Sequence, residues 1–246
     1  MTLPAHTAIK DSILEAIGAT PLVRLSRIGE NLVPQLVAKV EMLNPGGSVK
    51  DRIAVAMIDA AERDGHLRPG ATIVEPTSGN TGASLAIAAR LRGYRVIAVM
   101  PDKISREKIN LLRAYGAEVV VAPTDVVPES PESYYSVAER LASEIPGAFR
   151  LNQYSNPANP AAHYATTGPE LWEQTAGAIT HLVVGVGTGG TITGTARYLR
   201  ERNPAIEVSA PTPPARSSPR PRRKRSAGIS SRASARTSGR RRSIPR

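Results

Sequence analysis

The sequence predicts an α/β protein with a largely parallel sheet and helices on both faces. Short runs rich in Val, Ile and Leu alternate with longer segments of helical periodicity. The short runs are apolar at successive positions, which is typical of strands buried on both faces. Glycines punctuate the ends of the helical segments. Together these three observations favour strands that are joined by crossover helices.

The expected elements follow one another in strand–helix order. The first strand is Leu36-Val37-Ala38-Lys39-Val40, and further strands are expected over 72–75, 95–100, 118–121, 181–184 and 205–208. Helices are expected over 51–64, 105–115, 131–144 and 191–202, and in the segment that ends near 92. Gly65, Gly93 and Gly116 directly follow three of these helices, where a left-handed residue is needed.

The composition is that of an ordinary globular protein, with 246 residues of which 41% are hydrophobic and 22% charged. The absence of cysteine excludes a disulfide scaffold, a thiolate metal site and a cysteine nucleophile. His6, His66 and His181 have no ligand spacing, so no metal site is expected. There is no leader-like N-terminus and no run of roughly 18 apolar residues, so we expect a cytoplasmic protein.

The last 38 residues differ in composition from the rest of the chain. Residues 209–246 contain 11 Arg, one Lys and no acidic residue, whereas residues 1–208 contain 20 basic and 21 acidic residues. We therefore predict two regions: an α/β catalytic region over 1–208 and a disordered Arg/Ser/Pro-rich tail over 209–246. The tail is interpreted either as an arm that neutralises nucleic-acid phosphates or as the product of out-of-frame translation.

A lysine stands at a strand-to-helix junction in Asn44-Pro45-Gly46-Gly47-Ser48-Val49-Lys50-Asp51-Arg52. Ser48 is a candidate helix N-cap, and Asp51 follows three residues later as in a capping box. The positive end of the helix dipole favours the neutral amine of Lys50, which is the form that attacks aldehydes. From this loop alone, a surface lysine that extends into water is the simpler interpretation.

Two further loops connect a buried strand to a helix. Glu75-Pro76-Thr77-Ser78-Gly79-Asn80-Thr81-Gly82 offers hydroxyls, an amide and free helix N–H groups, which suit a carboxylate or a phosphate. Gly185-Val186-Gly187-Thr188-Gly189-Gly190-Thr191 lets the backbone approach an oxyanion closely. The second loop also matches the dinucleotide pattern G-x-G-x-x-G, with Glu207 about 20 residues later. A phosphate-bearing aldehyde cofactor accounts for both loops and Lys50, whereas a dinucleotide leaves two of these features unexplained.

These motifs together resemble those of the fold-type II pyridoxal-phosphate enzymes, the cysteine synthase and cystathionine β-synthase family. The resemblance covers Ile9–Val208. Three segments resemble the cystathionine β-synthases most: Ser130–Tyr135, Asn152–Pro157 and Asn159–Tyr164. The resemblance implies a three-layer α/β fold of the tryptophan synthase β type with two interleaved subdomains. It also implies a homodimer and pyridoxal 5′-phosphate as the cofactor.

The resemblance also implies roles for individual residues. Lys50 would hold the cofactor as a Schiff base and, once released, take the substrate α-proton, and Asn80 would bond the cofactor 3′ oxygen. The phosphate would be held by Gly187, Thr188, Gly189, Gly190 and Thr191. The substrate carboxylate would be held by Thr77, Ser78, Thr81 and Gln153. For His163, which lies among family-like residues, we expect packing or hydrogen bonding rather than catalysis.

The implied reaction is β-replacement, in which a thiol displaces the β-substituent of serine or of an activated serine. The partners would be small amino-acid and thiol substrates, with no membrane and no specific nucleic acid. A cystathionine β-synthase-like activity is the first hypothesis, and a cysteine synthase (O-acetylserine sulfhydrylase) is the second. No further family pattern is recognisable after Val208, so the catalytic region is expected to be incomplete. A third hypothesis is therefore an inactive truncated fragment whose tail binds polyanions. Haem is not expected, since family members that carry it use an N-terminal cysteine.

Overall fold

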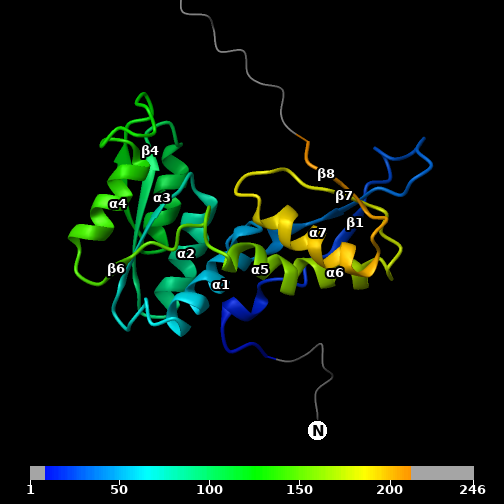
Figure 1. The fold of residues 1–246 in the computed structure, drawn as a ribbon, viewed down its shortest axis with the longest axis horizontal. Coiled ribbons are helices and arrows are strands. Elements are labelled where there is room, and N and C mark those ends of the chain that lie inside the picture. The colour runs from blue at the N-terminus through cyan, green and yellow to red at the C-terminus, as the bar shows by residue number, and fades with distance from the viewer. Residues whose placement is uncertain (1–8, 212–246) are drawn as a thin grey trace, which may run out of the picture. The chain divides into compact units, whose positions relative to one another are not determined.

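The computed structural model describes residues 9–211, and Figure 1 labels their elements in chain order. The helices are α1 (Lys50–Arg63), α2 (Asn80–Leu91), α3 (Arg106–Ala114), α4 (Tyr134–Glu144), α5 (Ala158–Ala165), α6 (Thr167–Gln174) and α7 (Gly190–Arg202), with the short 3₁₀ helices η2 (Ile13–Ala16) and η3 (Glu41–Leu43). The strands are β1 (Leu22–Arg24), β2 (Val37–Lys39), β3 (Thr72–Pro76), β4 (Arg95–Pro101), β5 (Glu118–Ala122), β6 (Ala148–Phe149), β7 (His181–Val183) and β8 (Glu207–Ser209).

Two expectations from the sequence concern the C-terminal tail and the absence of a membrane-spanning segment. Most of the tail that was predicted to be disordered, from residue 212 onward, lies outside the described residues. Ser209, which the prediction assigned to that tail, is the last residue of β8. Within the part of the chain that the structure describes, no helix has the length and apolar character needed to cross a membrane.

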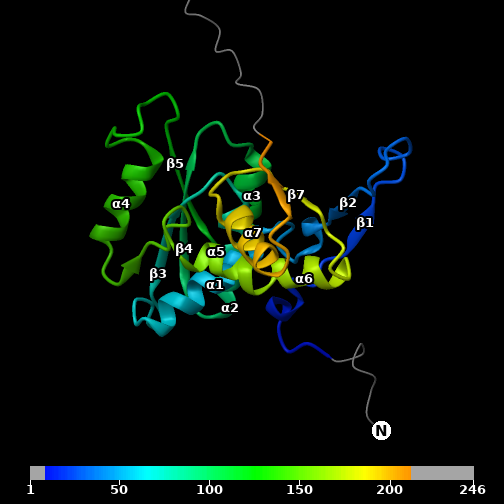
Figure 2. The same cartoon turned by 45° about the vertical axis from the view of Figure 1, so that its right-hand side comes forward.

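The largest sheet contains four parallel strands in the order β5-β4-β3-β6. All five residues of β3 are buried, because each face of the sheet is covered by helices. On one face, Val74 and Val99 pack against α4. On the other face, Ile73 and Met100 belong to a core shared with α1 and α2. Figures 1 and 2 show α4 and α2 on opposite sides of this sheet. The predicted fold class, parallel strands between two helix layers, is confirmed here.

The remaining strands form two small sheets beside a second core. β1 pairs antiparallel with β2, and β7 pairs parallel with β8. The second core contains Leu171 of α6, Leu182 of β7, Leu199 of α7 and Ile206. The expected strand over 36–40 therefore forms but lies outside the parallel sheet. Its partner β1 was not predicted, because three residues are too few to show a hydrophobic period.

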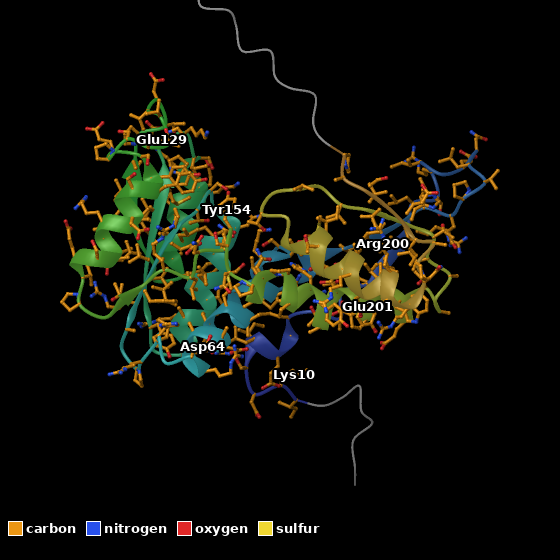
Figure 3. The ribbon with its side chains drawn as sticks, in the orientation of Figure 1. Lys10, Asp64, Glu129, Tyr154, Arg200 and Glu201 are labelled. Carbon is orange, nitrogen blue, oxygen red and sulfur yellow. The ribbon has the colours of Figure 1, made fainter. Side chains whose placement is uncertain are left out.

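Helices α5 and α6 were not predicted, and both contain a proline in their first turn. Pro160 and Pro169 are each the third residue of their helix, where the missing N–H group has no helical partner to lose. Both views show α5 between α1 and α7 (Figures 1 and 2). A side chain on Gly194 of α7 would collide with the Pro160 carbonyl oxygen, so the two helices approach closely. At the end of α7, Glu201 (Figure 3) accepts a hydrogen bond of 2.5 Å from the Tyr164 hydroxyl of α5.

A buried arginine joins four segments at the start of α1. The Arg52 side chain, 1% exposed, donates to the Glu41 carboxylate at 2.8 Å and to the Glu170 carboxylate at 2.7 and 2.8 Å. Glu170 also accepts from Lys39 Nζ at 2.7 Å and from the backbone N–H of Ala19 at 3.0 Å. Burial opposes the ionisation of Glu170, but these donors outweigh it and hold its pKa at about 2. The network connects η3, α1, α6 and the N-terminal segment.

We expect Glu170→Gln to reduce the acid sensitivity of the chain. The carboxyl pKa is about 4.3 in an unfolded chain and about 2 in the fold. Ionised Glu170 therefore stabilises the fold above about pH 4.3, and this contribution is lost as the pH falls toward 2. Urea unfolding should show the parent more stable than the variant at pH 6, with the difference shrinking below about pH 4.3. Glu173→Gln, at an exposed position of the same helix, should change little. A constant difference across this range would contradict the ion-pair role.

Candidate functional site

Lys50 is the first residue of α1, and side chains hold the loop that precedes it. The Ser48 hydroxyl accepts from the backbone N–H of Lys50 at 3.2 Å. The Asp51 carboxylate accepts from the backbone N–H of Gly46 at 2.5 Å and from the Ser84 hydroxyl. The predicted capping box is therefore wrong, because Ser84 of α2 and the Gly46 turn take up the carboxylate. The hydrogen bond between Ser84 and Asp51 therefore connects the start of α1 to α2.

A cavity of about 900 Å³ lies beside the N-terminus of α1. Lys50 lines it together with five residues of the glycine-rich loop, Gly185, Gly187, Thr188, Gly189 and Thr191. Most of the other lining side chains are aliphatic and come from the segments around β1, β2 and β7. The structure thus brings the predicted lysine and most of the predicted phosphate loop to one cavity.

Two lysines line this cavity, and their amines differ in their partners. Lys39 Nζ lies 2.7 Å from a Glu170 oxygen, 2.8 Å from the Thr20 carbonyl oxygen and 2.9 Å from Gln174 Oε1. These three contacts use all three N–H donors of the Lys39 ammonium group. Lys50 Nζ has no hydrogen bond or ion pair with any residue between 9 and 211. Burial lowers the pKa of Lys50. Of the two, Lys50 is therefore the amine suited to nucleophilic attack.

The glycine-rich loop presents donors to the cavity. Thr188 Oγ1 accepts from Asn159 Nδ2 at 3.0 Å and from the backbone N–H of Gly190 at 3.4 Å. Since both lone pairs are used, the hydroxyl proton remains to be donated to a ligand. A Cβ on Gly187 or Gly189 would have no atom within 4 Å, so open space stands before the backbone. The N–H groups of Thr191 and Ile192, which have no partner among residues 9–211, complete a donor set that fits a phosphate.

The loop at the start of α2 carries both buried and exposed side chains. Thr77 is buried, and its Oγ1 accepts from the backbone N–H groups of Gly79 at 3.1 Å and Gly82 at 3.2 Å. Ser78 and Asn80 are exposed. The predicted substrate and cofactor residues of this loop are not among those that line the 900 Å³ cavity. Thr77 therefore shapes the loop, while the two exposed side chains are available to a ligand.

Gln153 joins the two loops through hydrogen bonds. The Thr81 hydroxyl donates to Gln153 Oε1 at 2.8 Å. The Gln153 carbonyl oxygen accepts from Asn159 Nδ2 at 2.8 Å, and the same nitrogen reaches Thr188. Glu75, at the end of β3, accepts from the backbone N–H of Gln153 at 3.1 Å. One chain of hydrogen bonds thus runs from α2 to the glycine-rich loop.

Two residues that hold the site were missed in the sequence. Glu75 is 1% exposed, and burial raises its pKa although the backbone N–H groups of Gln153 and Asn152 bond its carboxylate. An acidic residue in a strand buried on both faces was the available signal, because a buried carboxylate needs partners. Asn159 carried no such signal, since amides are common on surfaces. For His163, the expected hydrogen-bonding role is confirmed, since both ring nitrogens have partners.

No three His, Asp or Glu side chains among residues 9–211 are grouped so that they could hold an ion. His66 stacks on the Phe149 ring at 4.8 Å, and His181 lies 3.6 Å from Glu207. Each of these histidines has a neighbour that accounts for its position.

Comparison with known proteins gives concordant matches. A family model described as "Pyridoxal-phosphate dependent enzyme" matches residues 13–239. A cystathionine beta-synthase of Apis mellifera is 52% identical over 210 residues, which cover 85% of this chain and 42% of that protein. The cystathionine beta-synthase of Oryctolagus cuniculus is 54% identical over 202 residues, 81% of this chain and 37% of that protein. Cysteine synthase 3 of Caenorhabditis elegans is 51% identical over 195 residues, 79% of this chain and 57% of that protein. The chain thus spans less than two thirds of each of these relatives.

We expect Glu75→Gln to destabilise the chain by about 1–3 kcal/mol. One carboxylate oxygen would become an amide N–H₂ group, which would face a backbone N–H of Asn152 or Gln153 and leave a buried donor unpaired. Chemical denaturation followed by circular dichroism measures the loss. Glu118→Gln is the matched control, because its side chain is 58% exposed in β5, another strand of the same sheet. Equal stabilities of the two variants would contradict the structural role of Glu75.

Proposed function

Because the chain belongs to the pyridoxal-phosphate dependent enzyme family, we propose that it holds pyridoxal 5′-phosphate on Lys50 and exchanges the β-substituent of serine, or of an activated serine, for a thiol. The observation that carries this proposal is the contrast between the two cavity lysines. Lys39 is fully bonded, whereas Lys50 is partly buried, has a lowered pKa and has no partner between residues 9 and 211. The cystathionine beta-synthases that match the chain support the choice of reaction.

The residues present fit the polar groups of the cofactor. Its phosphate would be held by the N–H groups at the start of α7 and by the hydroxyls of Thr188 and Thr191, with Gly187, Gly189 and Gly190 leaving room for it. Asn80 would bond the 3′ oxygen, and Lys50 Nζ would bond the aldehyde carbon. When bound, the cofactor withdraws electrons from the α-carbon of the amino acid.

The chain's own residues would then bind the substrate and move its proton. Lys50 Nζ, once released from the cofactor, would take the proton from the substrate α-carbon, and a lowered pKa keeps a larger fraction of that amine neutral. The substrate carboxylate would be held at the start of α2 by Ser78 and by Thr81 and Gln153, which are joined by a hydrogen bond. Thr77 supports this site by shaping the loop. The aliphatic lining of the cavity surrounds Lys50 and the glycine-rich loop, and would limit the access of water to them.

Two other functions remain candidates, each on a specific observation. Cysteine synthase activity is supported by the match to cysteine synthase 3 of Caenorhabditis elegans. The third candidate is an inactive fragment whose tail binds polyanions, and the 12 basic residues of 209–246, with no acidic residue among them, support that binding. Mass spectrometry of products separates the three. Serine with homocysteine tests the first function, and O-acetylserine with sulfide tests the second. Bound cofactor without either product would favour the third.

We further propose, from the family resemblance, that the chain pairs with a second copy. Met42 and Leu43 of η3 are 72% and 63% exposed just before the lysine loop, and a second copy would bury such apolar side chains. Sedimentation velocity tests this pairing. We also propose that the chain is divided into a catalytic region, 1–208, and an Arg/Ser/Pro-rich tail, 209–246. The 12 basic residues of the second region would bind polyanions in a salt-dependent manner.

Reductive trapping should attach the cofactor to Lys50. The full chain is loaded with pyridoxal 5′-phosphate, treated with borohydride and mapped by mass spectrometry. Lys50→Ala should lose both the label and the visible absorbance of the lysine-bound cofactor, because the other lysine of the cavity, Lys39, has all three donors engaged. Lys103→Ala, at an exposed position, should keep both. A label on Lys39, Lys103 or Lys108 would overturn the assignment.

Gly189→Asp should weaken cofactor binding about ten-fold or more relative to Gly189→Asn. The two variants have the same shape, and both residues tolerate the left-handed backbone that Gly189 adopts at φ +84°. They differ only in the negative charge placed beside the phosphate. Equilibrium dialysis of pyridoxal 5′-phosphate gives the two dissociation constants. Equal constants would mean that this loop does not hold the phosphate.

A further inference from the structure

The buried His163 of α5 touches the glycine-rich loop through one ring nitrogen. Its Nε2 lies 3.1 Å from Thr191 Oγ1, and its Nδ1 lies 2.9 Å from the hydroxyl of Thr167, the first residue of α6. Burial, with further contributions from the positive charges of Arg52 and Lys50, lowers the pKa of His163 to about 4. The ring is therefore neutral near pH 7, with one nitrogen donating and the other accepting.

The two tautomers of the neutral ring give Thr191 opposite roles. With the proton on Nδ1, the ring donates to Thr167, and Nε2 accepts the proton of the Thr191 hydroxyl. With the proton on Nε2, Thr167 donates to Nδ1 and the ring donates to Thr191 Oγ1, which leaves the Thr191 proton for a ligand. An anion in the loop needs donors, so it selects the second tautomer.

Asn159, one turn earlier on α5, likewise donates an N–H group to the hydroxyl oxygen of Thr188. Its Nδ2 donates to Thr188 Oγ1 at 3.0 Å and to the Gln153 carbonyl oxygen at 2.8 Å. The side chain is 2% exposed, and its Oδ1 has no hydrogen-bond partner in the described structure. A Cβ on Gly190 would collide with this amide, so the loop backbone is packed directly on it.

We propose that Asn159 and His163 are positioning residues that keep the Thr188 and Thr191 hydroxyls as hydrogen-bond donors to the cofactor phosphate. The inference rests on the proposed function, because it takes the loop as the phosphate site. Each α5 side chain supplies an N–H to a threonine oxygen, and each threonine then directs its own proton into the cavity. Both threonines line that cavity, whereas neither Asn159 nor His163 does.

The test compares two amides at position 163. The Gln side chain can place an N–H where Nε2 stood, toward Thr191, whereas the shorter Asn reaches only the Nδ1 position, toward Thr167. For the full chain and each variant, binding of pyridoxal 5′-phosphate and of pyridoxal is titrated, and the ratio of the two affinities isolates the phosphate. We expect His163→Asn to lower this ratio about ten-fold or more and His163→Gln to retain most of it. His66→Gln, at the exposed histidine that stacks on Phe149, should leave it unchanged.

A second pair of variants leaves the buried ring in place. Thr167→Val removes the donor to Nδ1 and should lower the affinity ratio about two- to ten-fold. Thr166→Val should not, because within residues 9–211 the Thr166 hydroxyl bonds the Ala162 carbonyl oxygen and no other group. This pair decides the question if the His163 variants do not fold.

The outcomes separate this inference from the proposed function. A parent chain that binds pyridoxal as tightly as pyridoxal 5′-phosphate would overturn both. A parent that prefers the phosphate, with equal ratios in His163→Asn and His163→Gln or in the two threonine variants, would overturn the positioning role alone. In a Thr191→Val background, His163→Asn should cause no further loss, since the ring acts through that hydroxyl. A further loss there would likewise overturn the inference.

Discussion

The site depends on the buried guanidinium of Arg52. A buried cation that loses one of its partners costs several kcal/mol, so Glu41 and Glu170 must both stay against it. This requirement holds η3 and α6 against α1 at Arg52, which is two residues from Lys50. It also recruits Lys39 to the same carboxylate, which removes that amine from the chemistry of the cavity. One ion network therefore orients the helix of the reactive lysine and separates the two lysines by function.

Helix α5 connects the parts of the site that lie far apart in sequence. Its close approach to α7 is possible because Gly194 has no side chain. That approach brings Asn159 and His163 under the glycine-rich loop, and Gln153, just before the helix, reaches Thr81 of α2. Because these polar side chains are buried, their hydrogen bonds are strong and an unmade bond is costly. The loops are consequently held in place before any ligand binds.

Local sequence was sufficient where the structure depends on local rules. The strands β3, β4 and β5 and the helices α1, α2 and α3 form close to their expected bounds, since hydrophobic periodicity and C-terminal glycines act within each segment. The helices α5 and α6 were missed because first-turn prolines hide their pattern. The Ser48–Asp51 capping box failed for the opposite reason. Its local signal was present, but Ser84 from another helix competed successfully for the carboxylate.

The sequence by itself determined the alternation of elements, the three polar loops and the identity of Lys50 as the candidate amine. Tertiary structure alone decided which lysine keeps an unpaired amine among the described residues, and which side chains stand behind the loop hydroxyls. Those properties depend on contacts between residues that are distant in sequence. Arg52 and Glu170 are 118 residues apart, and Thr81 and Gln153 are 72 residues apart. Periodicity and propensity describe a segment and its neighbours, whereas a buried charge or hydroxyl is defined by whichever distant atom fills its bonding capacity.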